Sequence, residues 1–353
     1  GFGLMYYPKY GATFEDNGTF ELDYSFYVVG KGVSINKVSV TVDIRDIYVS
    51  SAADIKDAFA NAKDGDTIIL SDDIVAAEGD AFLTLRADAG DLDVTLDLNE
   101  RRLDYRLDLR STTADNKESG SKLTVKIENG AIGSDTGYNA VGGEIAYGML
   151  IAGGNVDLTL NKVTAYGVYG GIYENGSWKG SVVNATDCSF IGVSGGGAYL
   201  PGGHTSTFTD CEFIGTLGAY IKSGNKTFNN CTIRATGEYI APSYNGNGAD
   251  GDGSGIVVDS TVGYNQPMSV TVNGGTIESK NGYAIEEVSN AKEGVEEVCY
   301  SEVIVTGGAK LSGGKGEVYS ENGVVTVNTD NGAVMPVSTE TALKNALANV
   351  RGG

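Results

Sequence analysis

Short runs of alternating apolar and polar residues recur along the chain and predict many short β-strands. Three runs align without gaps: NATDCSFIG (184–192), TFTDCEFIG (207–215) and TFNNCTIRA (227–235). Strand alternation places each cysteine, and the apolar residue two positions later, on the inner face, and the residue between them faces water. The aspartate or asparagine before each cysteine predicts a sharp bend, because short polar side chains tolerate left-handed backbone.

Two columns of aligned residues run through these repeats. The first holds Cys188, Cys211 and Cys231, and it extends to Arg101, Gly130, Val163, Gly275 and Gly308. The second holds glycines that each precede a short apolar stretch, namely Gly148, Gly171, Gly197, Gly218, Gly255, Gly282 and Gly316. No single repeat can bury its own inner face, so stability must come from stacking repeats about 4.8 Å apart. The predicted fold is all-β, a right-handed parallel β-helix solenoid that spans residues 48–336.

Amphipathic segments flank the repeats. SAADIKDAFANAK (51–63) predicts a short N-terminal capping helix with an apolar stripe of Ile55, Ala58, Phe59 and Ala62, and DGDTIIL (64–70) predicts the first strand. Residues 337–351 match residues 49–63 at a constant offset of 288, which predicts a second helix in 337–353. This helix is either a C-terminal cap or the start of a second β-helix repeat in a longer tandem chain.

Residues 1–47 lie outside the repeat pattern and predict a small N-terminal β appendage. The segment TFEDNGTFELDYSFYVV reads as a hairpin around Asn17 and Gly18, and alternation over 38–44 predicts a half-buried strand.

Composition agrees with a chain of strands and tight turns. The 353 residues include 52 glycines but only 5 prolines, and 41% are hydrophobic. The net charge of −21 argues against nucleic acid and anionic membranes as partners, because both repel an acidic protein. No apolar run is long enough for a transmembrane helix, so no membrane insertion is expected, and the start lacks a signal-peptide pattern. The aligned cysteines are interpreted as an interior ladder of small apolar thiols rather than as disulfides.

The order of amphipathic helix, DGDTIIL strand and Asn-bent repeats resembles pectate-lyase-like right-handed β-helices, over roughly residues 48–336. This group includes pectinolytic enzymes and bacterial surface adhesins, so the resemblance implies an extracellular or bacterial cell-surface location. Its functional content is unspecific, because one fold hosts many functions.

Catalytic motifs of the group do not recur in the expected order. Asn328-Thr329-Asp330 follows the single histidine, His204, whereas Asp72-Asp73 lies near the start. Arg234 is the only arginine between residues 131 and 336, so an anionic uronate would meet little positive charge. Arg234, near the acidic 245–255 loop, is where a catalytic site would be sought.

A column of tyrosines offers a binding surface. If Ile172, Ala198, Ala219 and Ile256 point inward, then Tyr173, Tyr199 and Tyr220 form an exposed ladder on which sugar rings could stack. Trp178, Tyr239 and Tyr244 are candidate extensions of this ladder. The alternative is that the rings stack on one another without a ligand.

One repeat carries an insertion, residues 237–255, and loops on repeat scaffolds often carry function. Its hard oxygen ligands make calcium possible, as an alternative to a plain surface loop: Asn245, Asn247, Asp250 and Asp252. We therefore expect a non-catalytic, secreted surface module, adhesin-like or carbohydrate-binding. The alternatives are a polysaccharide-active lyase or glycoside hydrolase and a passive structural spacer.

Overall fold

The computed structural model describes residues 18–23, 37–42, 46–80, 82–87, 90–111, 121–176, 178–244, 250–261, 267–296 and 298–351. The chain divides into two compact units, Gly1–Asp46 and Ile47–Gly353. In the first unit, β1 (Gly18–Asp23) pairs antiparallel with β2 (Lys37–Val42). The turn predicted at Asn17 lies outside the described residues.

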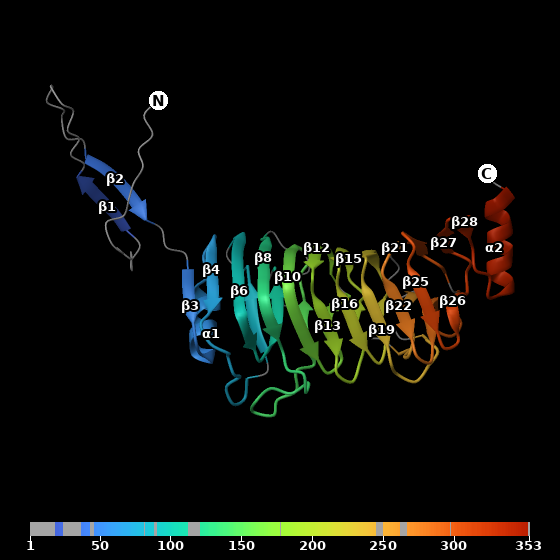
Figure 1. Ribbon diagram of the computed structural model, residues 1–353, viewed down its shortest axis with the longest axis horizontal. Helices are drawn as coiled ribbons and strands as arrows, with labels where there is room; N and C mark the ends of the chain where they lie inside the picture. The colour runs from blue at the N-terminus through green and yellow to red at the C-terminus, as the bar shows by residue number, and fades with distance from the viewer. Residues whose placement is uncertain are drawn as a thin grey trace, which may run out of the picture. The chain divides into compact units, whose positions relative to one another are not determined.

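The second unit is built from two long sheets in which parallel pairing dominates (Figure 1). The first sheet contains β3 (Asp46–Val49), β4 (Asp66–Leu70), β6 (Leu92–Leu103), β8 (Leu123–Ile132), β10 (Val156–Gly167), β12 (Lys179–Thr186), β13 (Ser189–Gly192), β15 (Gly203–Thr209), β16 (Glu212–Gly215), β18 (Gly224–Asn229), β19 (Thr232–Ala235), β21 (Met268–Asn273), β22 (Thr276–Ser279), β24 (Ser301–Thr306), β25 (Lys310–Gly313), β27 (Val325–Thr329) and β28 (Gly332–Val334). The second sheet contains β5 (Phe82–Arg86), β7 (Arg106–Arg110), β9 (Tyr147–Ile151), β11 (Gly170–Glu174), β14 (Ala198–Leu200), β17 (Ala219–Ile221), β20 (Ile256–Thr261), β23 (Tyr283–Asn290) and β26 (Gly316–Ser320).

The same three-strand unit recurs along the second unit of the chain. From β12 to β26, two strands of the first sheet are followed by one strand of the second sheet, and we call each such set a rung. From β4 to β11, a rung has a single first-sheet strand followed by one second-sheet strand, and β10 pairs with both β12 and β13. Each rung pairs in parallel with the next, as β12, β13 and β14 do with β15, β16 and β17. The apolar inner faces of both sheets share one core. This all-β arrangement is compatible with the predicted β-helix solenoid.

The bend between the two first-sheet strands of a rung is set by left-handed residues. Asp187, Asp210 and Asn230 have φ angles of 54°, 53° and 51°, as their residue types predicted. They continue a column that includes Asn129 and Lys162, with φ of 60° and 55°, and that begins at Asn99 and Glu100, with φ of 49° and 62°. These rungs are therefore bent at an equivalent position, which keeps the strands on either side in register.

The cysteine column is confirmed as an interior ladder. Cys188, Cys211 and Cys231 are buried in the core, lie opposite one another through strands β13, β16 and β19, and are free thiols. A hydrogen bond with Cys211 and burial raise the pKa of the Cys188 thiol. Its extension to Gly308 is wrong by one residue, because Thr276 pairs with Lys310 and so places Ala309 opposite Gly275.

The glycine column is confirmed from Gly148 to Gly255, where neighbouring backbones approach closely. A Cβ on Gly218, for example, would lie 2.2 Å from the Gly255 carbonyl oxygen. The last two members are wrong. Ile256 pairs with Ile285, so Ala284 takes the place predicted for Gly282, and Gly316 pairs with Tyr283.

Helix α1 (Ala52–Asn61) caps the first rungs as predicted. The Ser51 hydroxyl accepts a hydrogen bond from the Asp54 amide at 3.2 Å, which satisfies one free N–H of the first turn. Ile55, Ala58 and Phe59 are buried in the core. Helix α2 (Glu340–Arg351) follows the last rungs. In the part of the chain that the structure describes, neither helix is long and apolar enough to cross a membrane.

Lys162 is the one lysine in the left-handed column, and an asparagine tolerates that backbone better. We expect Lys162→Asn to stabilise the second unit by about 1 kcal/mol or less, which would raise the midpoint of urea unfolding. Lys310→Asn is the matched control, since Lys310 is an exposed strand residue that is not left-handed. An equal shift in both variants would contradict the assignment of strain to Lys162.

Candidate functional site

The tyrosine column lies on the outer face of the second sheet. Ile172, Ala198, Ala219 and Ile256 are all in the main core, as predicted. Tyr199 and Tyr220 belong instead to a separate apolar cluster outside that core, and Tyr173 packs against it. The predicted direction of these side chains is therefore confirmed.

The predicted exposure of the ladder is wrong for two of its three members. Tyr199 and Tyr220 are buried, because Leu217 and Val257 pack against the rings. The Tyr220 hydroxyl also donates a hydrogen bond of 2.8 Å to the buried Asp259 carboxylate. Burial and this carboxylate raise the pKa of Tyr220 well above its ordinary value. Tyr220 therefore cannot present its face to a ligand, and Tyr199, although it lines the groove described below, is only 4% exposed.

The aromatic column continues toward the N-terminal rungs, where it is open. Tyr147 stacks on Tyr173 with ring centroids 3.8 Å apart, and Tyr173 lies 4.5 Å from Tyr199. Tyr169 lies 6.3 Å from Tyr147, and 52% of its surface is exposed. Tyr147 and Tyr169 were missed in the sequence because they flank the aligned apolar stretches rather than falling within the ladder.

These open tyrosines border a groove of about 360 Å³. One wall comes from the turns between the sheets, and another comes from the inserted segment. The residues that line it include Tyr147, Tyr169, Tyr173, Thr216, Leu217, Ile240, Asp250 and Asp252. The insertion therefore has two effects on the tyrosine column: it lies beside the covered rings and it forms a wall of the groove at the open ones.

The other aromatic candidates do not join this groove. Trp178 is buried, so its predicted role as an exposed extension is wrong. Tyr244 is exposed but does not line the groove. The Tyr239 hydroxyl donates to Glu286 at 2.6 Å, and the Lys315 ammonium lies 3.8 Å from the Tyr239 ring centroid. Tyr239 thus belongs to a second polar and aromatic cluster.

The predicted calcium ligands are only partly described. Asn245 and Asn247 lie outside the described residues. The Asp250 carboxylate accepts hydrogen bonds from the amide and hydroxyl of Ser243, and Asp252 accepts one from the Gly253 amide. Among the described residues, no group of three or more His, Cys, Asp or Glu side chains could hold a metal ion. Calcium binding stays a prediction.

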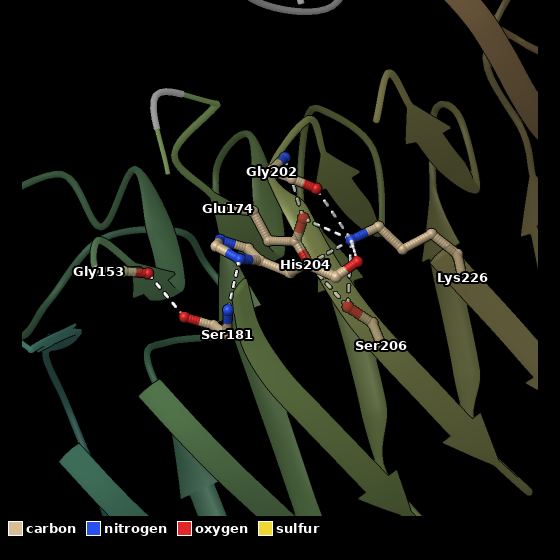
Figure 2. A network of polar contacts seen from close by, with 7 residues as sticks. All are labelled: Gly153, Glu174, Ser181, Gly202, His204, Ser206 and Lys226. Carbon is tan, nitrogen blue, oxygen red and sulfur yellow. Dashed lines mark hydrogen bonds and ion pairs between the residues drawn. The ribbon is translucent and has the colours of Figure 1, made fainter. Parts of the chain in front are cut away.

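A buried ionic network lies in the rungs around Glu174 (Figure 2). The Lys226 ammonium donates to both Glu174 carboxylate oxygens, at 2.9 and 2.8 Å. The same carboxylate accepts hydrogen bonds from the Ser206 hydroxyl at 2.9 Å and the Gly202 amide at 3.1 Å. Both charged side chains are fully buried, and burial lowers the pKa of Lys226.

His204 lies beside this pair in the core. Its Nδ1 accepts a hydrogen bond from the Ser181 amide at 3.2 Å, and its Nε2 is buried without a hydrogen-bond partner among the described residues. Burial lowers the pKa of His204 to about 4. The histidine is therefore neutral near pH 7, and its position inside the core keeps it from any substrate in solvent.

The sequence pattern could have predicted that Lys226 points inward, but the alignment of the cysteine and glycine columns did not include this residue. Ser206 pairs with Lys226, and Lys226 pairs with Val270, so the lysine occupies an inward-facing column. The two-residue spacing from Phe228 would have placed Lys226 inside. Its partner Glu174 is 52 residues away and could not be assigned from the pattern.

Comparison with known proteins gives no relative for this chain. No family model matches the sequence, and neither a curated protein nor a solved structure matches it. Function must therefore be inferred from the site itself.

His204 makes stability depend on pH. Its pKa is about 4 in the folded protein, whereas the ordinary value of 6.5 applies to the unfolded chain, which therefore binds more protons between these two values. Stability consequently falls as the pH drops below 6.5. We expect His204→Gln to lose less stability than the wild type over this range, measured as unfolding midpoints at several pH values. A difference between the two proteins that stays constant from about pH 7.5 to about pH 4.5 would contradict this role.

The Lys226–Glu174 pair should show strong coupling. Lys226→Met leaves a buried carboxylate without its cation and should cost about 3–5 kcal/mol. Adding Glu174→Gln removes the stranded charge, so the double variant should be more stable than Lys226→Met alone. Unfolding midpoints of the two single variants and the double variant measure this coupling. Simple additivity of the two substitutions would show that the pair does not interact.

Proposed function

We propose that this chain is a right-handed parallel β-helix of the pectate-lyase-like kind and acts as a non-catalytic, extracellular module on a bacterial surface. In this proposal it binds carbohydrate in the groove bordered by Tyr147, Tyr169 and Tyr173. The observation that carries the proposal is a tyrosine cluster beside a hollow of about 360 Å³, in which Tyr147 and Tyr173 are stacked and half-buried and Tyr169 is exposed. A flat aromatic face next to polar groups is what a sugar ring requires, since its C–H face is apolar and its rim carries hydroxyls.

The chemistry of the groove favours neutral sugars. Asp250 and Asp252 are hydrogen-bond acceptors for sugar hydroxyls, and Thr216 adds a hydroxyl. None of the described lining residues is a lysine, arginine or histidine, and the chain has a net charge of −21. An acidic uronate would therefore be repelled rather than held.

The enzyme alternative finds less support at the residues that would carry it. His204 is buried within the core, and the Arg234 guanidinium forms an exposed ion pair of 3.1 Å with Glu278. Neither side chain lines the tyrosine groove. The passive spacer alternative predicts no carbohydrate binding, so the binding experiment separates it from the proposal.

The test is a glycan-array screen followed by titration of any sugar that binds. Tyr169→Ala and Tyr147→Ala should each weaken binding about tenfold, because each removes a stacking ring. Tyr48→Ala is the matched control, since Tyr48 is an exposed tyrosine that does not line the groove. Circular dichroism checks that every variant keeps its fold.

Binding that survives both groove substitutions, or no binding to any sugar, would overturn the proposal and favour a spacer. The same titration with calcium and with a chelator tests the calcium prediction. Loss of binding in the chelator would bring the 245–252 segment into the site.

A further inference from the structure

The two helices of the second unit are copies of one sequence segment with the same start. Residues 337–351 align with 49–63 at an offset of 288. The Thr339 hydroxyl accepts a hydrogen bond from the Ala342 amide at 3.0 Å, as the Ser51 hydroxyl does from the Asp54 amide. Equivalent positions in the two copies can therefore be compared directly.

Three apolar positions of the repeat have different environments in the two copies, whereas a fourth, Ala58 and Ala346, is buried in both. Val49, Ile55 and Phe59 are 1%, 0% and 7% exposed and lie in the core of the rungs that follow α1. Their counterparts Val337, Leu343 and Leu347 are 45%, 47% and 49% exposed. We call these three residues the outer stripe of α2.

A second side of α2, about 100° around the helix axis from the two leucines, contacts the rungs that precede it. Ala342 is fully buried where the first copy has the exposed Asp54. Ala346 is also buried, and the Asn345 side-chain amide donates to the Asn322 carbonyl at 2.8 Å. Helix α2 therefore closes the last rungs with one side while its outer stripe keeps the apolar residues that α1 uses against its own rungs.

We propose that the outer stripe of α2 is a docking surface for the first rungs of a second β-helix module, built like the rungs that begin with β4 and β5. In the first copy, this stripe is covered by such rungs, and the chain passes from α1 into β4 through a short turn. The Asp66 carboxylate accepts a hydrogen bond from the Lys63 amide at 2.7 Å in that turn. Lys344 and Glu340 on the same helix are exposed and form an ion pair of 2.7 Å with each other.

The test is a tandem chain in which residues 1–351 are followed directly by residues 64–353, so that α2 takes the place of α1 for the second module. Hydrogen exchange should show the second copy of β4 and β5 protected as well as the first copy. Leu343→Glu with Leu347→Glu in the shared helix should abolish that protection, because two charges would enter an apolar contact.

Two controls make the result specific. In the original 353-residue chain the same double substitution should leave the thermal midpoint unchanged, since both leucines are half exposed there. Thr341→Glu in the tandem chain should leave the second module protected, because Thr341 is exposed and its counterpart Ala53 stays exposed beside the rungs that follow α1.

A second module that stays unprotected behind the unchanged helix, or that stays protected after the double substitution, would overturn the proposal. A concentration-dependent dimer of the original chain that Leu343→Glu abolishes would also overturn it, because the stripe would then bind a second copy of α2. None of these outcomes depends on carbohydrate binding, so this proposal and the proposed function fail separately.

Discussion

In-register parallel pairing between successive rungs is the constraint on which the rest of this structure depends. When rung follows rung without a slip, each position along a strand becomes a column, and each column has one environment. The left-handed bend at Asp187, Asp210 and Asn230 fixes where each rung turns. A slip of one residue would exchange the inner cysteines for the outward-facing polar residues beside them. The bend thus decides both the core and the outer face on which the tyrosines stack.

The same constraint brings a lysine into the core. Lys226 lies in a column whose other residues are apolar or small, so its charge needs a partner of opposite charge inside the rungs. Glu174 meets it from the second sheet, with Ser206 and Gly202 filling the remaining hydrogen bonds. A well-packed apolar pair of similar size would be at least as stable, since burying two ions is costly. Unlike an apolar pair, the ion pair also favours one register of these rungs, because a shifted register would leave the two buried charges apart.

Features that depend on residues close in the sequence were predicted correctly. Features that depend on contacts between distant segments were not. The cysteine ladder, the bends, the capping helix and the inward direction of Ala198 and Ala219 all follow from local alternation and alignment. Gly282 was misplaced because alternation does not fix the register of β23, in which Ala284 rather than the nearby glycine lies opposite Gly255. The burial of Tyr199 and Tyr220 depends on Leu217 and Val257, which local alternation does not place beside them. Period-two alternation predicts which face of the sheet a side chain lies on, but it does not predict whether a side chain on the outer face is exposed to solvent.

The two copies of the helix segment, residues 49–63 and 337–351, also differ in how far equivalent side chains are exposed. Val49 and Val337, or Ile55 and Leu343, occupy the same positions of one motif, yet only the first of each pair is covered. Where the first copy has the exposed Asp54, the second has the buried Ala342, which contacts the preceding rungs, while Leu343 and Leu347 are apolar and half exposed. A helix that only closed a stack would gain solubility from a polar outer face, as terminal caps of repeat proteins do. The retained leucines therefore favour a helix with two packing sides over a simple cap.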